Sequence, residues 1–312
     1  MKRFKNILLV CDFDTKQQVA VEHAVSLSQQ NEAKLTVFSV VKDVPADIGT
    51  SITAVTQQEF FKQIINDRQE QLNSLLADIN KQGVEAETMV VTGTPFIEIV
   101  RQVLRNKHDL VITAAEDKKG IRAHLFGTTS MHLMRKCPCP VWVIKRAHSG
   151  SFRHIMAAID PSAYDPKRDS LNPLILQLAS SMARKESADL HIVHAWHLYG
   201  ESYINRLGMK EEDILKAKTF EKKQHKDRVD NLLSKLDVID LKPYLHLVEG
   251  YPDDLIPELV VSQGIDLLVM GTVCRTGIAG FLIGNTAEEV LNEVDCSVLT
   301  LKPEDFITPV TL

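Results

Sequence analysis

A strand, a glycine-rich loop and the start of a helix follow one another in Leu267–Asn285, which reads Leu-Leu-Val-Met-Gly-Thr-Val-Cys-Arg-Thr-Gly-Ile-Ala-Gly-Phe-Leu-Ile-Gly-Asn. The apolar residues at its beginning are typical of a buried strand, and Thr286–Leu291 has the composition of a helix start. Glycine lacks the Cβ that would hold a ligand away, and a helix N-terminus offers backbone N–H groups without partners. The stretch therefore predicts an anion-binding loop that follows a strand in an α/β fold.

The part of the chain that ends in this loop repeats an earlier part. Three pairs of segments lie 157 residues apart: Val91–Pro95 and Val248–Pro252, His108–Thr113 and Ile265–Met270, Cys139–Lys145 and Cys296–Lys302. Ungapped self-similarity over about fifty residues indicates that a whole domain has been duplicated. We expect one domain at residues 1–148 and another at 149–312, joined through a short polar linker.

Each half is predicted to alternate strands with helices. The expected strands include Phe4–Asp12, Lys34–Val41, Glu87–Val91 and Val141–Ile144 in the first half, and Phe152–Asp160, Asp189–Trp196, Leu245–Val248 and Val298–Leu301 in the second; long helices are expected at Gln57–Lys81 and Glu211–Leu236. Such alternation is typical of a parallel sheet covered by helices on both faces. The predicted fold class is α/β, with two tandem flavodoxin-like domains of five parallel strands in the order 3-2-1-4-5.

In a sheet of this order, ligands bind beyond the carboxyl ends of the first and fourth strands, where the strand order reverses. In the second half, Asp160 follows the first strand and Gly271 ends the fourth. The N–H groups of Gly284, Asn285 and Thr286, at the helix entry, would point at a phosphate. Asn285 and Thr286 also suit helix capping, so a cap without a ligand is the alternative.

Composition excludes several classes of partner. The chain has 312 residues, a net charge of −5 and no run of about 18 apolar residues. This balance argues against nucleic acid as the main partner and against a membrane span. The apolar run Ile7–Val10 is too short for the core of a signal peptide, and five sparse cysteines do not resemble a disulfide framework. We therefore expect a cytoplasmic protein.

The spacing of Gly271, Cys274 and Gly284-Asn285 resembles the nucleotide-binding motif of universal stress proteins, Gly-x2-Gly-x9-Gly-Ser/Thr. The aspartate that closes each first strand, the Gly-x-Pro before the third helix and the Cys-x-Val-x-x-x-Lys ending also resemble this family, once in each half. The resemblance implies ATP, with or without Mg²⁺, or another adenine nucleotide at the switch point. Asp160 would lie at the adenine and ribose, Gly271 near the ribose, and Gly284 with Asn285 at the phosphates. It also implies that the halves pair about a pseudo-two-fold axis through their last strands.

Two substitutions depart from the motif in the second half. Cys274 replaces the second glycine, and Asn285 replaces Ser/Thr with an amide that still donates and accepts hydrogen bonds. Arg275 would either add positive charge to a phosphate contact or remain solvated.

The first half departs further from the motif. Ala114 and Asp117 stand at the two glycine positions, and only Gly127-Thr128 remains. A carboxylate would repel a phosphate by about 1 kcal/mol at 4 Å even with full water screening. We expect that this half has lost nucleotide binding and serves structure or association.

No catalytic or metal-binding constellation stands out in the sequence. Cys137-Pro-Cys139 has neither redox nor zinc spacing, and Cys139, which begins an apolar strand, is interpreted as a buried structural thiol. His191 and His194 point to opposite faces of a strand. The leading hypothesis is a stress-response protein that binds ATP and acts through conformational or association changes, self-association included. The alternatives are a slow ATPase, or a binder of a different phosphate-bearing or apolar ligand without ATP.

Overall fold

The computed structural model describes residues 3–13, 17–43, 57–115, 126–145, 151–161, 171–200, 210–272 and 284–312. Within these residues the chain divides into two compact units. The N-terminal unit is built on the chain up to residue 145 and includes the C-terminal segment Asp305–Leu312; the C-terminal unit is built on residues 151–272 and 284–304. Asp117, Cys274 and Arg275, which the sequence singles out, lie outside the described residues.

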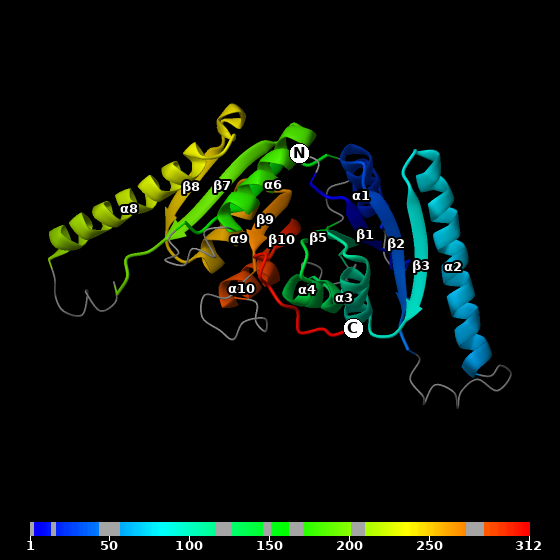
Figure 1. Ribbon diagram of the computed structural model, residues 1–312. Coiled ribbons are helices and arrows are strands. Elements are labelled where there is room, and N and C mark those ends of the chain that lie inside the picture. Colours follow the sequence, from blue (N-terminus) through cyan, green and yellow to red (C-terminus); the bar gives the residue numbers. More distant parts are fainter. Residues whose placement is uncertain are drawn as a thin grey trace. The chain divides into compact units, whose positions relative to one another are not determined.

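The N-terminal unit is a parallel sheet with helices between its strands (Figure 1). Its elements are β1 (Asn6–Val10), α1 (Gln18–Asn31), β2 (Lys34–Val41), α2 (Gln57–Lys81), β3 (Ala86–Thr92), α3 (Pro95–Asn106), β4 (Leu110–Ala114), α4 (Thr128–Lys136) and β5 (Val141–Ile144). The strands lie in the order β3-β2-β1-β4-β5, and every pair of neighbours is parallel. The predicted order 3-2-1-4-5 is confirmed for this unit.

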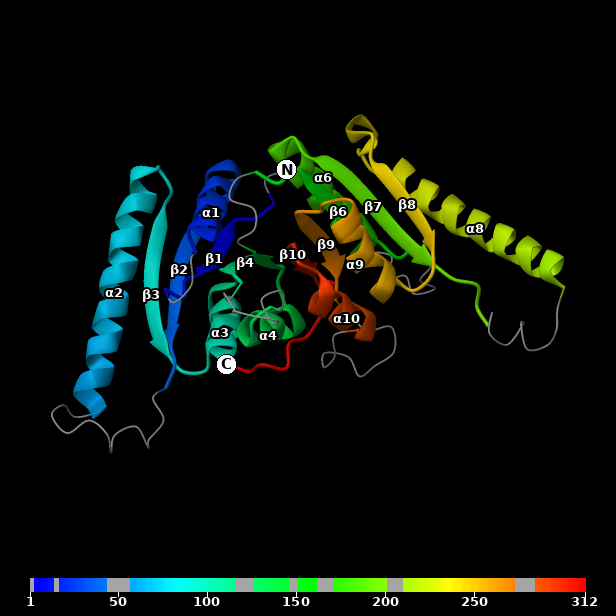
Figure 2. The same cartoon turned by 180° about the vertical axis from the view of Figure 1, so that it is seen from behind.

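The C-terminal unit repeats the same arrangement, as the view from behind also shows (Figure 2). Its elements are β6 (His154–Ala158), α6 (Leu171–Glu186), β7 (Asp189–Trp196), α8 (Glu211–Ser234), the short 3-10 helix η3 (Ile239–Leu241), β8 (Tyr244–Glu249), α9 (Pro252–Ser262), β9 (Leu267–Gly271), α10 (Asn285–Glu293) and β10 (Ser297–Leu301). The strands follow the order β8-β7-β6-β9-β10, again with parallel neighbours. The predicted α/β fold class is thus confirmed in both units.

The central strands are buried on both faces, as parallel strands covered by helices must be. Leu8 and Ile112 in the N-terminal unit, and Met156 and Val269 in the C-terminal unit, are fully buried. Right-handed crossovers place the helices between the first three strands on one face of each sheet, and the later helices on the other. The apolar runs that predicted these strands from the sequence therefore form the two cores.

The third strand of each unit ends in a turn that only glycine adopts easily. Gly93 and Gly250 have φ values of 139° and 141°, in the region that L side chains avoid. Pro95 and Pro252 then occupy the first turn of α3 and α9, where a missing N–H costs nothing. This repeated Gly-x-Pro turn brings the chain back across each sheet toward the fourth strand.

The strands and helices match the sequence expectations with small shifts at their ends. The third strands are longer than expected, at Ala86–Thr92 and Tyr244–Glu249, and α8 ends at Ser234, two residues before the predicted end. None of the helices within the described residues is long and apolar enough to cross a membrane. The pseudo-two-fold pairing of the two halves stays a prediction.

Candidate functional site

The carboxyl ends of two neighbouring strands meet where the sequence predicts a site. In the C-terminal unit β6 pairs directly with β9, with Ala158 opposite Met270. Asp160 follows β6 by two residues, and Gly271 is the last residue of β9. Both predicted residues therefore lie at the same edge of the sheet, at its switch point.

A side chain from α6 fixes the backbone of Asp160. The Asp160 N–H donates to Asn172 Oδ1 at 2.8 Å, and Asn172 Nδ2 donates to the Asp160 carbonyl at 3.0 Å. Asn172 is only 4% exposed, whereas Asp160 is partly exposed. This clamp holds the residue at the end of β6 in one position. The sequence analysis missed Asn172; the only signal was an amide in the first turn of a helix, where such residues often bond to backbone groups.

Gly271 is explained first by packing against α6. A Cβ built on Gly271 would lie 2.4 Å from Leu171 Cδ2, closer than such atoms approach in real proteins. The sequence attributes this glycine to close approach of a ligand. The structure adds a second reason, because the start of α6 occupies the space that a side chain would need.

The two ends of the glycine-rich loop are joined by hydrogen bonds. The Gly284 N–H donates to the Thr272 carbonyl at 3.2 Å, and the Thr272 N–H donates to the Leu301 carbonyl at 3.2 Å. Lys302 Nζ donates to Thr272 Oγ1, and both side chains are buried. Thr272 and Gly284 therefore lie next to each other, beside β9 and β10. Thr272 and Lys302 were not predicted as site residues, although Lys302 belongs to the repeated Cys-x-Val-x-x-x-Lys ending.

The helix after the loop begins with exposed residues. Gly284 is the N-cap of α10, with φ −64° and ψ 140°, and no side chain among the described residues caps it. The capping alternative for Asn285 and Thr286 is therefore wrong in detail, since these residues form the first turn of the helix. Both are exposed, and backbone N–H groups at such positions have no partner within the helix. Whether these groups contact a nucleotide stays a prediction.

A pair of histidines lies beside Asp160 on the side of α8. His194 Nδ1 lies 3.2 Å from the Ile159 carbonyl, and a carbonyl only accepts, so this nitrogen carries the proton. In neutral His194 the other nitrogen then accepts from His225 Nδ1, at 2.8 Å. His225 Nε2 in turn lies 3.8 Å from Glu221 Oε2. A chain of polar groups thus runs from the backbone before Asp160 to the surface of α8.

Burial lowers the pKa of His225 below its usual value, and the positive charge of Arg228 acts in the same direction. The carboxylates of Glu221 and Asp160 oppose this shift, so the charge of His225 is coupled to the predicted site. The Trp196 ring lies 5.8 Å from the His225 ring, centroid to centroid. His225 could not be recognised from the sequence as a residue near the site, because it lies in a long helix rich in Lys and Glu.

The equivalent place in the N-terminal unit is built differently. Asp12, two residues after β1, lies 3.8 Å from a guanidinium nitrogen of Arg68 on α2. The same guanidinium lies 5.2 Å from the centre of the Phe13 ring. Arg68 precedes His225 by the 157-residue offset of the duplication. The fourth strand ends at Ala114, and α4 begins after Gly127, with Thr128 exposed.

The two strand histidines that the sequence analysis separated have different partners, which confirms that they face opposite ways. His191 Nδ1 lies 3.0 Å from His246 Nε2, and its ring stacks on Tyr244. Burial lowers the pKa of His191 to about 4, and the nearby His246 and His154 act in the same direction. Within the described part of the chain, no three His, Cys, Asp or Glu side chains are arranged to hold a metal ion.

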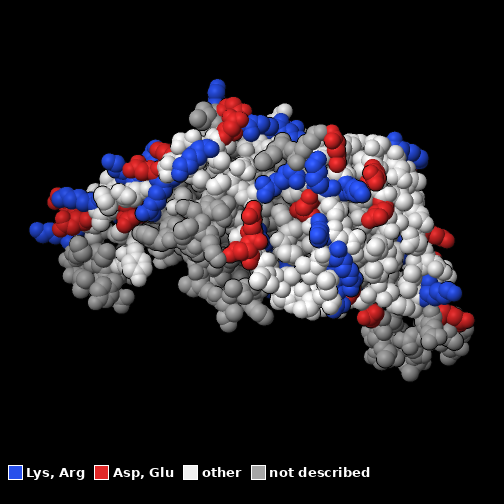
Figure 3. All heavy atoms as spheres, in the orientation of Figure 1, with Lys and Arg blue, Asp and Glu red and all other residues white. Residues whose placement is uncertain are grey.

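The charges of α8 alternate in sign. Lys216 pairs with Glu212 at 2.8 Å and Lys226 with Asp230 at 2.5 Å, and the helix buries His225 and Val229. Figure 3 shows Lys and Arg interspersed with Asp and Glu over this region, without a large patch of one sign. Most charged side chains of α8 are therefore solvated, and His225 and Val229 form its buried side.

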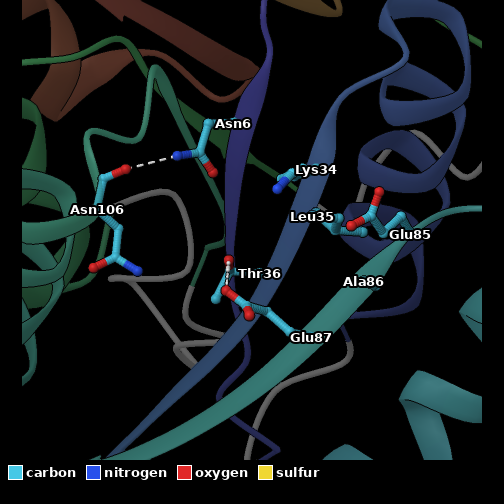
Figure 4. A pocket seen from close by; sticks show the side chains of 8 residues that line it. All are labelled: Asn6, Lys34, Leu35, Thr36, Glu85, Ala86, Glu87 and Asn106. Carbon is cyan, nitrogen blue, oxygen red and sulfur yellow. Dashed lines mark hydrogen bonds between the residues drawn. The ribbon is translucent and has the colours of Figure 1, made fainter.

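A cavity of about 290 Å³ lies away from the predicted site, in the N-terminal unit (Figure 4). It is lined by Asn6, Lys34, Leu35, Thr36, Glu85, Ala86, Glu87 and Asn106. These residues lie at the amino ends of β1, β2 and β3 and at the end of α3, whereas the switch point lies at the carboxyl ends. Thr36 Oγ1 donates to Glu87 Oε1 at 3.0 Å across it. None of the residues predicted to bind nucleotide lines this cavity.

Comparison with known proteins identifies the pattern that both units share. A model of the universal stress protein family matches residues 3–145 and again residues 151–302. Universal stress protein E of Salmonella typhi is 29% identical over 315 aligned residues, which cover 100% of this chain and 98% of that protein. The protein of the same name from Escherichia coli (strain K12) is 28% identical with the same coverage.

Solved structures agree on the fold. A functionally unknown protein from Pseudomonas aeruginosa PAO1 has a TM-score of 0.75 and 23% identity, over 97% of this chain and 94% of that chain. A putative universal stress protein from Pseudomonas aeruginosa UCBPP-PA14 has a TM-score of 0.73 and 23% identity, over 97% and 95%. At this level of identity the likeness concerns the fold alone.

Proposed function

Because this chain belongs to the universal stress protein family, with the family pattern present once in each half, we propose that its C-terminal unit binds an adenine nucleotide. The ligand is ATP, alone or with Mg²⁺, at the carboxyl ends of β6 and β9. The bound nucleotide acts by shifting the protein between conformational or association states, since binding to one state in preference to another is sufficient for such a shift. The cytoplasmic location and self-association stay predictions from the sequence.

The observation that carries this proposal is the gathering of three kinds of group at one edge of the C-terminal sheet. Asp160 is held by Asn172 at the end of β6, where a carboxylate can accept hydrogen bonds from ribose hydroxyls. The Gly284 N–H donates to the Thr272 carbonyl, so it holds the two ends of the loop together, and the phosphate contact expected of this N–H is left to the residues that follow. The exposed first turn of α10, with Asn285 and Thr286, offers N–H groups and the positive end of the helix dipole to phosphates.

The same comparison leads us to propose that the N-terminal unit does not take a nucleotide. Arg68 lies beside Asp12, at the position equivalent to Asp160. Ala114 replaces the glycine that ends the fourth strand, and the sequence places the carboxylate of Asp117 where the motif has its second glycine. At the first glycine position the C-terminal unit keeps Gly271, and at the second it has the uncharged Cys274 in place of a carboxylate.

The proposal is tested by titrating the full-length protein with ATP and Mg²⁺ in a calorimeter, using a pair of matched variants. Asn285→Asp keeps the size of the side chain and favours the start of a helix, so the fold should not suffer. The carboxylate that this substitution introduces beside the phosphates costs about 1 kcal/mol or more of binding free energy, which weakens ATP binding at least about fivefold. Thr128→Asp, at the exposed start of α4 in the N-terminal unit, is the control and should leave the affinity unchanged.

Each outcome has a definite meaning. Absence of ATP binding by the wild-type protein, together with no nucleotide in native mass spectra of the purified chain, would overturn the proposal and favour a different ligand. Weakening by Thr128→Asp, with no effect of Asn285→Asp, would move the site to the N-terminal unit. Phosphate release that Asp160→Ala abolishes would turn the binding protein into a slow ATPase.

A further inference from the structure

Two thiols meet in the turn that joins α4 to β5 of the N-terminal unit. Cys137 Sγ and Cys139 Sγ lie 3.5 Å apart, with only Pro138 between the two residues. The Cys137 N–H donates to the Leu133 carbonyl at 2.8 Å, which fixes Cys137 at the end of the helix. From the sequence, Cys139 is interpreted as a buried structural thiol. The contact between their sulfur atoms gives the pair a chemistry that neither residue has alone.

The two thiols differ in their access to solvent. Cys137 is fully buried, whereas Cys139 is partly exposed. Cys11 is 1% exposed and Cys296 is fully buried, so a dissolved oxidant cannot easily reach either of them. Of the two residues, Cys139 is therefore the one nearer to solvent, so a small oxidant that enters from the surface would meet Cys139 before Cys137.

The C-terminal unit shows that the turn itself does not require a thiol at position 137. The equivalent residues are Val294, Asp295 and Cys296. Cys137 has φ −70° and ψ 131°, and Val294 has φ −70° and ψ 137°, so the two turns share one backbone conformation. Val294 donates to the carbonyl four residues earlier at 3.0 Å, as Cys137 does. The same turn thus forms with valine at this position in the C-terminal unit, and a thiol at this position is found in the N-terminal unit only.

We propose that Cys137 and Cys139 form a site of reversible oxidation, in which a hydroperoxide converts the dithiol to an intramolecular disulfide. The Cys139 thiolate attacks one peroxide oxygen, the O–O bond breaks, and hydroxide or an alkoxide leaves while a sulfenic acid forms. Cys137 sulfur then attacks the sulfenic sulfur, the S–O bond breaks, and water leaves with the Cys137 proton. Overall the two sulfur atoms lose two electrons and two protons, and the peroxide is reduced.

The surroundings of the two thiols determine how fast they are oxidised and how easily the disulfide is reduced again. The hydrogen bond with Cys137, and then burial, hold the pKa of the Cys139 thiol well above its usual value. Little thiolate is present at neutral pH, so oxidation is slow and becomes faster as the pH rises. A disulfide that spans only three residues, Cys137-Pro138-Cys139, closes a small ring, and such a bond is readily opened again by thiol–disulfide exchange.

The change would be local in the structure. A disulfide across three residues closes almost no loop, so it hardly constrains the unfolded chain and adds little stability. It acts instead on the turn that leads into β5, where the Pro140 carbonyl accepts from Val111 N–H at 3.0 Å. Oxidation is therefore expected to alter the end of α4 and the start of β5 without unfolding the unit.

The test treats the full-length protein with hydrogen peroxide, alkylates the remaining thiols and maps the peptides by mass spectrometry. The wild-type chain has five cysteines and should lose two alkylatable thiols, in a peptide that is lighter by two hydrogens, and dithiothreitol should restore both. Cys137→Val, which copies Val294 of the other unit, should form no such peptide. Cys296→Ser should still lose two thiols.

Three results would overturn the proposal. The first is that the wild-type protein keeps all five thiols under conditions that oxidise a free dithiol peptide. The second is a linkage that joins Cys139 to any cysteine other than Cys137, or to a second chain. The third is conversion of Cys139 to a sulfinic acid at the same rate in the wild-type protein and in Cys137→Val, because a working partner thiol would intercept the sulfenic acid first.

Discussion

The carboxyl ends of β1 and β6 are two copies of one structural element, and their surroundings differ. In the N-terminal unit, Ser39 Oγ donates to the Cys11 carbonyl at 2.8 Å, and Arg68 lies beside Asp12. In the C-terminal unit, His194 bonds to the equivalent carbonyl of Ile159 at 3.2 Å and continues to His225. A side chain from the second strand fixes the backbone before the aspartate in both copies. What differs is how the long helix of each unit takes part.

The comparison indicates which interactions near the aspartate are required in both units and which are not. The carbonyl before the aspartate needs a donor in both units, because a buried carbonyl without one would cost about 1–3 kcal/mol. The residue on the long helix is not constrained in the same way, since an arginine lies near the aspartate in one unit and a histidine in the other. An arginine keeps its positive charge near Asp12 at every ordinary pH, whereas a buried histidine with a lowered pKa is largely neutral near pH 7.

The sharpest test of this comparison replaces His194 with the residue that the other unit uses. His194→Ser keeps a donor near the Ile159 carbonyl but leaves a cavity and takes the partner from His225 Nδ1. We expect the C-terminal unit to lose about 2–4 kcal/mol of unfolding free energy. The two tryptophans, Trp142 and Trp196, lie in different units, so a Trp142→Phe background reports the C-terminal unit by fluorescence in urea.

The control is Ser39→Ala in the N-terminal unit, followed in a Trp196→Phe background. It removes one hydrogen bond to the Cys11 carbonyl and leaves almost no cavity, so we expect a loss of about 1 kcal/mol. If His194→Ser costs no more than Ser39→Ala, the link between His194 and His225 contributes nothing to the fold. The histidine pair would then have to be explained by the ligand alone.

The sequence predicted the fold well because its signals are local. Apolar runs such as Leu267–Met270 gave the strands, and the Gly-x-Pro turns at Gly93 and Gly250 fixed where the chain reverses. The repeat allowed the same reasoning to be applied twice. Asp160 and Gly271 could be placed at one edge of the sheet because parallel strands share their carboxyl end.

The remaining parts of the site could not be read from the sequence, because they depend on contacts between residues far apart in the chain. Asn172 holds the backbone of Asp160 from the first turn of α6, and Lys302 reaches Thr272 from the end of β10. His225 lies in a helix whose charges predict exposure, and only the packing of α8 on β7 buries it. Spacing along the chain carries no signal for such contacts.

Gly271 and Ala114 extend the comparison to the fourth strands. Gly271→Ala would bring a Cβ to 2.4 Å from Leu171 Cδ2, so the start of α6 must shift. We expect a loss of about 1–3 kcal/mol in the unfolding free energy of the C-terminal unit, the usual cost of overpacking. Urea unfolding in the Trp142→Phe background measures it.

A double variant decides whether the glycine serves packing. Leu171→Ala removes the clashing atoms, so Gly271→Ala should cost much less in that background than in the wild type. If the two costs simply add, the glycine is needed for another reason. A loss of ATP affinity in the double variant would then assign Gly271 to close approach of the ligand.

Arg68→Ala gives the smallest expected effect. The Asp12 side chain is 51% exposed and lies 3.8 Å from the guanidinium, so water screens the ion pair and it contributes between 0 and about 1 kcal/mol. The contact with the Phe13 ring adds about 0.5–1 kcal/mol. Unfolding of the N-terminal unit in the Trp196→Phe background should therefore shift by about 1 kcal/mol, and part of this shift should vanish in 1 M salt, where the Debye length falls to about 3 Å. A loss greater than about 3 kcal/mol would show instead that Arg68 is essential to the packing of α2. The N-terminal unit would then depend on its arginine as strongly as the C-terminal unit depends on its histidine pair. The long helix would contribute a similar unfolding free energy in both units, through different side chains.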